Sequence, residues 1–289
     1  MAFVRALAVA ASVCMAAPVL GQQSIDLATL TVVTAGYHHL HGRDLLMSIN
    51  RNVPACPPSA TNNGCRPVAA HANNAEYSAA GSSTYHGFHV SVARRPAGWG
   101  HYRVSYALGK SMNNLGEFFF SSPIDPFDLS TDWGRADSDR RHQLVMFASV
   151  TAPALRDDSW WGRLLHRFQA SAMLQAYSAL PLNVTSGMTT LQGTQGRPIA
   201  DGTFVPRNAG TGSDFLSLNA RLPRPVHPGD RVAVDLMVEG FNLTNHTNAL
   251  ARNGNFGAGA YPENPALGFG AITAVGEPRS AQLGVRLRF

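Results

Sequence analysis

The sequence contains little charge, almost no lysine and no hydrophobic run long enough for a membrane-spanning helix. Charged residues make up 14% of the 289 residues, against about a quarter in typical soluble domains. Apolar residues nevertheless make up 45%, a combination that is unusual for a soluble enzyme. Lys110 is the only lysine, and the residues behind the net charge of +5 form no clustered basic run, which argues against a nucleic acid partner. Strands that cross a membrane would reconcile low charge with the missing apolar run.

Cysteine is also scarce, and the first of the three lies in an N-terminal segment with its own signature. Arg5 precedes the apolar stretch 6–17, and small or compact residues follow up to Gly21. Residues 1–21 therefore resemble a secretory signal peptide cleaved near Gly21. The run is too short and too rich in alanine for a good spanning helix, while a misplaced start codon stays open as an alternative. Cys14 follows Val13, which is too bulky for a lipoprotein site.

The remaining cysteines, Cys56 and Cys65, lie nine residues apart in a stretch rich in proline and asparagine. In an exported chain this spacing predicts a disulfide that closes a small loop. A metal pair is the weaker alternative, because no CxxC spacing and no third and fourth ligand accompany the two thiols.

Motifs for catalysis or metal binding are missing as well. The histidines at 38, 39 and 41 fall where the first strand would leave the membrane, and a polar aromatic rim explains them better than a metal site. Five aspartates between 125 and 139 miss the calcium-loop pattern and have Arg135, Arg140 and Arg141 among them, which favours an ion-paired loop. There is no nucleophile elbow and no glycine loop in a strand–helix context. We therefore predict no enzymatic activity, no cofactor and no metal.

Alternation of apolar and polar residues is the strongest pattern that is present. It recurs in eight segments of about ten residues, the length that a tilted strand needs to cross the hydrocarbon layer. The alternation is weakest in the fourth segment, where Val145 and Phe147 intrude on the polar face. The segments are residues 30–39, 86–95, 101–110, 142–151, 167–177, 215–222, 231–241 and 280–289.

The connections between these segments alternate between short and long. The shorter ones are residues 96–100, 152–166 and 223–230, and the long ones are residues 40–85, 111–141, 178–214 and 242–279. Long loops on one side and short turns on the other are typical of outer-membrane barrels and rare in soluble domains. The pattern predicts an all-β protein, an antiparallel transmembrane β-barrel segment of about eight strands with four long extracellular loops.

The last segment predicts a terminal strand with two distinct faces. Its apolar residues should face lipid and act in membrane insertion, while Gln282, Arg286 and Arg288 should face the lumen. The lipid-facing residues of this terminal membrane-insertion strand are Leu283, Val285, Leu287 and Phe289.

Several motifs resemble the C-terminal barrel of Oar-like TonB-dependent receptors. The run Thr131-Asp-Trp-Gly-Arg-Ala-Asp-Ser-Asp-Arg-Arg-His142 is similar to the D-x-G-x-S-D-x-D-x-R-H stretch that opens a strand in that family. Segments beginning at Tyr85, Tyr106, Leu180 and Glu239, and the ending at Phe289, match family segments in the same order. The family-motif loop residues carried over are Asp132, Gly134, Asp137, Asp139, Arg141 and His142.

Members of that family have a plug domain, a TonB-contacting segment and a barrel of twenty-two strands. The resemblance here covers only the late barrel, so it implies a C-terminal barrel portion, residues 22–289, that is truncated and lacks plug and TonB box. It also implies residence in the bacterial outer membrane as part of a receptor or transporter, with the missing plug and N-terminal barrel half as partners if the receptor is split. Outer-membrane lipid, lipopolysaccharide and the barrel-assembly machinery are the other expected partners.

An independent eight-stranded barrel with an adhesion or anchoring role is the alternative. A closed barrel of that size has an interior filled by side chains, or with room for one small ligand. It would have to pair residues 30–39 with residues 280–289, because an open sheet leaves edge N–H and C=O groups unsatisfied in lipid.

Overall fold

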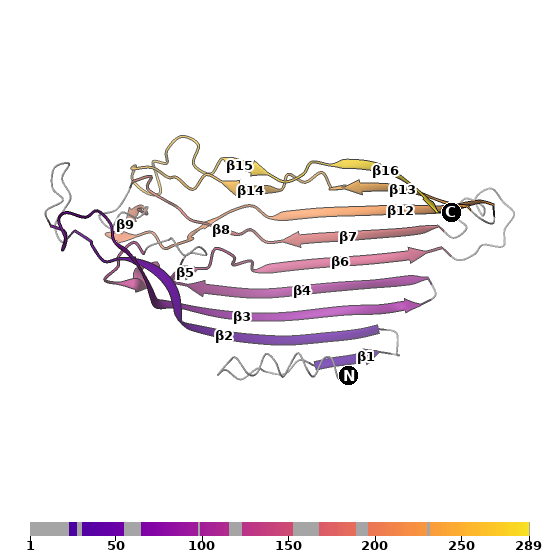
Figure 1. The fold of residues 1–289 in the computed structure, drawn as a ribbon, viewed down its shortest axis with the longest axis horizontal. Helices are drawn as coiled ribbons and strands as arrows, with labels where there is room; N and C mark the ends of the chain where they lie inside the picture. Colours follow the sequence, from indigo (N-terminus) through magenta and orange to yellow (C-terminus); the bar gives the residue numbers. More distant parts are fainter. Residues whose placement is uncertain are drawn as a thin grey trace.

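Long antiparallel strands lie side by side in one curved sheet (Figure 1). The computed structural model describes residues 23–27, 31–54, 65–97, 99–115, 123–152, 168–188, 196–229 and 232–288. The expected signal peptide, residues 1–21, lies outside these ranges. In spatial order the long strands are β1 (Gln23–Leu27), β2 (Thr31–Asn50), β3 (Ala75–Ala97), β4 (Gly100–Asn113), β6 (His142–Thr151), β7 (Gln169–Tyr177), β12 (Phe215–Gly229), β13 (Val232–Phe241) and β16 (Ser280–Arg288). Neighbours in this order pair antiparallel throughout.

The eight alternating segments correspond to the strands from β2 to β16, so the predicted all-β antiparallel architecture is confirmed. Even the weakest segment is a strand, and β6 begins and ends at the predicted residues. Phe147, which interrupts the alternation of β6, lies with its ring centroid 5.5 Å from that of His101 on the neighbouring strand. A local aromatic contact thus accounts for an apolar residue on the otherwise polar face.

Three boundaries differ from the prediction. The hairpin of β2 and β3 is much longer than predicted, because β2 continues to Asn50 and β3 begins at Ala75. The predicted loop 40–85 is thus shortened to residues 51–74. Residues 223–229, predicted to be a turn, belong to β12. A further strand, β1, precedes the predicted set. Irregular alternation hid the longer hairpin, and prolines at 223, 225 and 228 hid the end of β12. Residues 23–27 are too few to show a clear alternation.

β12 tolerates proline because its pairing with β7 ends before the first proline is reached. Pro223 and Pro225 lie opposite Met237 and Asp235 of β13. On its other side β12 is paired with β7 only as far as Arg221. The missing N–H groups of both prolines therefore remove no ladder hydrogen bond on the β7 side, which is the edge-like position where strand prolines occur.

The register brings the apolar residues of all these strands onto one continuous face. Val33 lies opposite Val92, and Val92 lies opposite Val104. At the other end of the sheet Leu236 lies opposite Val285. The opposite face is polar and borders a hollow of about 740 Å³, whose lining includes His89, Ser91, Arg103 and Phe147.

In the described part of the chain, no second layer packs on the apolar face of the sheet. Leu283, Val285 and Leu287 are 80%, 66% and 62% exposed. The buried apolar residues lie instead toward the long loops, and they are Met47, Ile49, Val53, Ile124, Ala136, Ala179, Val184, Val205 and Phe256. A soluble sandwich would bury its apolar strand faces against another sheet, so this distribution fits strands that face lipid.

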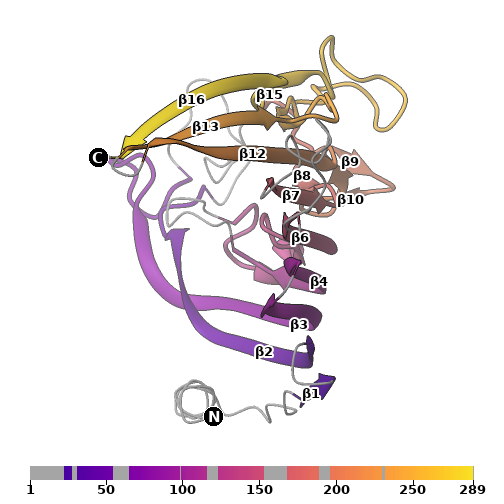
Figure 2. The ribbon, with the colours of Figure 1, turned by 90° about the vertical axis from the view of Figure 1, so that its right-hand side faces the viewer.

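The sheet is an open arc rather than a closed barrel (Figure 2). β1 forms one edge and β16 the other, and among the described residues β16 pairs with β13 alone. β2, the strand expected to meet the terminal strand in a small closed barrel, lies between β1 and β3 instead.

The long connections contain short strands of their own, gathered at one end of the sheet (Figure 1). These strands are β5 (Gly134–Arg135), β8 (Pro181–Leu182), β9 (Ile199–Ala200), β10 (Thr203–Phe204), β11 (Gly210–Thr211), β14 (Ala249–Arg252) and β15 (Ile272–Val275). A 3₁₀ turn, η1 (Leu129–Asp132), precedes β5. β16 ends at the opposite end, on the side of the short turns. No helix in the described ranges is long and apolar enough to span a membrane.

Candidate functional site

The family-motif loop, residues 131–142, lies at the centre of a polar network at the loop end of the sheet. It starts at η1, whose N-cap is Asp128. The Asp128 carboxylate accepts hydrogen bonds from the Ser130 hydroxyl at 2.6 Å and the Ser130 backbone N–H at 3.0 Å. These bonds, the hydroxyl first, lower the pKa of Asp128 below its ordinary value. The loop thus begins with an ionised cap that fixes the turn before Asp132.

Asp132 ties η1 to a segment 65 residues away. Its side chain accepts a hydrogen bond from Arg197 Nη1 at 2.7 Å and another from the Ile124 backbone N–H at 2.7 Å. Arg197 also donates from Nη2 to the Thr131 carbonyl at 2.8 Å. Asp132 and Arg197 are both buried, so each neutralises a charge that would be costly alone.

Gly134 lets β5 approach the third long connection closely. β5 pairs with the end of β4, where Gly134 lies opposite Asn113. A Cβ at Gly134 would come within 2.6 Å of the Arg207 carbonyl oxygen. Because that atom belongs to the backbone, it could not move aside cheaply, and this position needs glycine.

Arg207 fills the space between the second and third long connections. Its guanidinium donates to the backbone oxygens of Asp132, Asn113 and Arg135, each at 3.2 Å, and also to the side-chain oxygen of Asn113. It forms an ion pair with Asp137 at 3.3 Å. A planar group with five N–H donors suits such a convergence of carbonyl oxygens.

Asp137 has a second partner beside Arg207. The Asn208 side-chain amide donates to Asp137 Oδ1 at 2.5 Å and to the Arg135 carbonyl at 2.8 Å. Asn208 is buried and has a positive φ of 57°, a conformation that asparagine tolerates better than most residues.

Asp139 is the most buried carboxylate of the loop, at 1% exposed. It accepts hydrogen bonds from Arg135 Nε at 2.9 Å, Arg141 Nε at 3.0 Å and the Ser111 backbone N–H at 2.7 Å. The three donors come from both sides of the turn and from β4. The aspartates of the motif thus hold the loop through ion pairs and backbone N–H groups, and among the described residues no group of three His, Cys, Asp or Glu could hold a metal ion.

His142 closes the motif at the first residue of β6. Its backbone N–H donates to the Ser178 hydroxyl at 3.0 Å, and its Nδ1 lies 2.7 Å from the Tyr106 hydroxyl. The motif therefore brings β4, β6 and β7 together where they meet the loops.

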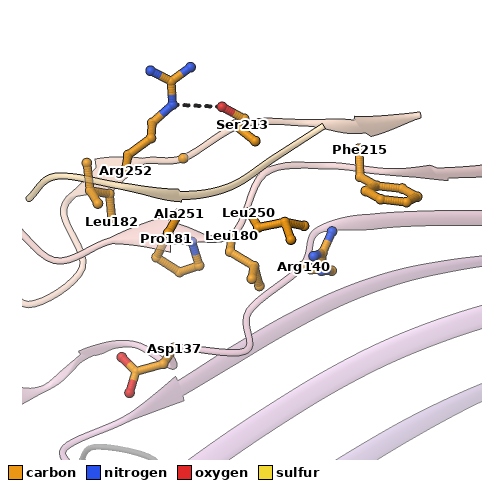
Figure 3. Close-up of a pocket in the computed structure, with 12 residues that line it drawn as sticks. Asp137, Arg140, Leu180, Pro181, Leu182, Ser213, Phe215, Leu250, Ala251 and Arg252 are labelled. Atoms are coloured by element: carbon orange, nitrogen blue, oxygen red, sulfur yellow. Dashed lines mark hydrogen bonds between the residues drawn. The ribbon is translucent and has the colours of Figure 1, made fainter. Parts of the chain in front are cut away.

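A pocket of about 260 Å³ lies beside this network (Figure 3). Its wall is apolar at Leu180, Leu182 and Phe215. Two arginines border it, and both have protein partners. Arg252 Nε donates to the Ser213 hydroxyl at 2.7 Å, and Arg140 lies 5.1 Å from the Tyr177 ring centroid.

The structure places the other predicted residues away from this network. Leu283, Val285 and Leu287 share the exposed apolar face of β16, while Phe289 lies outside the described residues. Cys65 is disulfide-bonded. Its expected partner, Cys56, also lies outside the described residues, so the pairing stays a prediction.

Sequence reasoning missed Arg197, Arg207 and Asn208, which join separate loops, and Asn52, which holds the first long loop together. Buried Asn52 donates to the carbonyl oxygens of Val68 at 3.0 Å, His71 at 3.0 Å and Ala72 at 2.7 Å. Each acts through contacts more than fifteen positions away. For the pair Arg207-Asn208 the sequence offered one signal only, because asparagine tolerates the left-handed backbone conformation that Asn208 adopts.

The open antiparallel arc with a lipid-type outer face defines the class of protein. The chain belongs to the outer membrane beta barrel domain family, whose model matches residues 22–204, more than half of the chain. A solved structure with a similar fold is the outer membrane transporter YddB from Escherichia coli, with a TM-score of 0.56 and 14% sequence identity. The match covers 92% of this chain and 31% of the transporter. No curated protein matches the chain. Because the chain belongs to this family and has a fold similar to that of an outer membrane transporter, the protein is located in the bacterial outer membrane.

Proposed function

We propose that these residues form the C-terminal part of the barrel wall of a TonB-dependent receptor, with no enzymatic activity. The plug and the earlier strands would come from protein outside this sequence. The strands supply the wall of a transport channel, and the long loops supply its outer rim.

The observation that carries this proposal is the open arc. Each edge strand exposes a row of N–H and C=O groups, which are costly in lipid. Additional strands that continue the sheet from β1 and from β16 would satisfy both rows at once. The similarity in fold between 92% of this chain and 31% of a larger transporter chain supports an arc that is one part of a larger barrel.

Individual side chains of the motif loop also support this proposal. Its resemblance to Oar-like receptors falls on side chains that hold the loops in one arrangement, such as Asp139 and Arg141. A rim with fixed loops suits ligand contact, and none of its charged groups is arranged for acid–base or nucleophilic chemistry in the described part of the chain.

Cysteine crosslinking distinguishes this arc from a small closed barrel. Ala35 of β2 and Val285 of β16 would be neighbours only if the chain closed on itself. In membranes that contain the full chain, the pair Ala35→Cys and Val285→Cys should give no intrachain crosslink, even when the partner position is shifted by two residues in either direction.

The matched control uses two residues that lie opposite each other. Ala35 faces Val90 of β3, so Ala35→Cys with Val90→Cys should crosslink efficiently and prove that the strands have formed. Efficient crosslinking of Ala35 with Val285 would instead support the independent eight-stranded barrel with an adhesion or anchoring role.

A further inference from the structure

A row of histidine and lysine side chains borders the apolar face on the side of the long loops. His39 of β2 lies opposite His86 of β3, and His86 lies opposite Lys110 of β4. His142 of β6 lies opposite Leu108, two residues from Lys110 on the same face. We refer to His39, His86, Lys110 and His142 as the histidine–lysine row. Strand alternation places the row on the lipid-facing side of the sheet, directly above the apolar band.

The depth of this row matches the lipid headgroups. At the other end of the band, Arg94 of β3 lies over the Trp99 ring, 4.6 Å from its centroid. The stretch from His86 to Arg94 is roughly 26 Å along the strand, which a tilt of about 40° reduces to about 20 Å of height. This height falls a few Å short of the apolar band of about 25 Å in outer-membrane barrels, and the long side chains of Lys110 and Arg94 extend their charged groups over the remaining distance to the interfaces.

Tyrosine hydroxyls hold two of the imidazole rings in place. Tyr37 approaches His86 Nδ1, and Tyr106 approaches His142 Nδ1, both at 2.7 Å. When the tyrosine donates this bond, the ring carries its proton on Nε2, where it can donate to a ligand. The rings of His39 and His86 have centroids 4.3 Å apart, and the buried Nδ1 of His39 has no hydrogen-bond partner.

No carboxylate in the described part of the chain forms an ion pair with any member of the row. His86, Lys110 and His142 are exposed. A cation on the lipid-facing surface is costly unless it meets an anion or extends to water. Lys110 is the only lysine of the sequence, and it lies in this row.

We propose that the histidine–lysine row binds the phosphate groups of lipopolysaccharide in the outer leaflet. The row extends over four neighbouring strands, about 14 Å at the usual strand spacing, and thus offers several donors to one phosphorylated headgroup. Ammonium and imidazole N–H groups form strong charge-assisted hydrogen bonds with phosphate oxygens. The inference needs the outer-membrane location and long loops on the outer side, and it holds whether or not the chain is part of a receptor.

Lipid binding by the full chain, folded in detergent micelles, tests the proposal. Lipid A and the same lipid without its phosphates are titrated separately, and bound lipid is counted by native mass spectrometry. The unaltered chain should bind the phosphorylated lipid at least tenfold more tightly. Millimolar inorganic phosphate should not displace it, because the site takes its phosphate from a membrane lipid.

Variants then assign the binding to the row. Lys110→Gln with His86→Gln should abolish the preference for phosphate, and Lys110→Arg alone should keep it. Arg103→Gln is the matched control, because Arg103 lies on the same strand, is exposed, and borders the hollow on the opposite face. Equal affinity of the unaltered chain for the two lipids, displacement by inorganic phosphate, or an equal loss in the Arg103→Gln control would each overturn the proposal, even if the double variant failed to fold.

Discussion

At the scale of single residues, the loop end of this protein depends on charges buried in contact with one another. Asp139 shows the principle, because its carboxylate is almost inaccessible yet has two arginines and a backbone N–H as donors. Burial of an ionised group is tolerated only when such partners replace water. Removing the Asp139 carboxylate therefore takes away the shared ion-pair partner of Arg135 and Arg141.

Replacing Asp139 by alanine should destabilise the folded chain by about 2 to 3 kcal/mol. This lies below the 3 to 5 kcal/mol typical of a broken buried pair, because Arg135 and Arg141 keep part of their access to water. Urea titration in detergent micelles measures the change. Asp125→Ala is the control, since its half-buried carboxylate accepts one local bond from the Phe127 backbone N–H and its loss should cost less than about 1 kcal/mol. Equal effects of the two substitutions would contradict the central role of Asp139.

At the scale of elements, each long strand has one face for lipid and one for polar groups. On β16, Val285 is exposed and lies opposite Leu236, while Gln282 lies opposite Glu239 on the other face. Arg286 lies opposite Asp235 on that same polar face, where opposite charges stabilise a strand pair. The two faces should therefore respond differently to the same kind of substitution.

Arginine at position 285 should destabilise the chain in lipid vesicles by about 2 to 4 kcal/mol, the cost of a cation near the bilayer midplane. Gln282→Ser, on the same strand, should change the folding free energy by less than about 1 kcal/mol. Folding titrations in vesicles compare the two. A similar penalty at both positions would mean that β16 is buried on both faces.

The first long loop, residues 51–74, is an element with two separate restraints. The Asn52 side chain donates to three carbonyl oxygens and accepts from the Val68 N–H at 2.8 Å. Cys65 supplies the second restraint through its disulfide. The Asn52 contacts lie within the loop, and so would the predicted bond between Cys56 and Cys65, so neither should influence the strands in the membrane.

Breaking the disulfide with Cys56→Ser and Cys65→Ser should loosen this loop alone. A ring this short restrains the loop itself and constrains little of the remaining chain. Limited proteolysis should become faster between residues 51 and 74, while the melting temperature of the strands stays unchanged. Thiols that alkylate in the unaltered protein without reductant would show that Cys56 and Cys65 are not paired to each other.

At the scale of the whole molecule, contacts between distant loops hold the rim together. Arg207 contacts β4, η1 and β5 in one site, and Thr185 of the third connection bridges Asn255 of the fourth. These contacts join parts of the chain that are 70 to 94 residues apart. The loops therefore behave as one cap over the end of the sheet.

Replacing Arg207 by alanine should release β5 and the third connection together while leaving the strands intact. Hydrogen exchange at the backbone amides of residues 134–139 should become at least tenfold faster, which corresponds to about 1.4 kcal/mol. Arg43→Ala, an exposed arginine of β2, should change nothing in these residues. Faster exchange across β7 and β12 would show that the loops support the whole sheet.

The sequence by itself determined eight of the nine long strands in the described sheet, with their direction and faces. Alternation in segments such as residues 142–151 and 280–289 was sufficient, because a strand between lipid and a polar lumen must alternate wherever it is in the membrane. It failed for residues 40–50, 75–85 and 223–229, where prolines or irregular patterning hide the strands. Only the tertiary structure decided that β2 pairs with β1 rather than β16, that Gly134 lies under Arg207, and that Arg197 meets Asp132. These contacts depend on residues far apart in the chain, and no local pattern records which of many arginines will lie beside a given carboxylate.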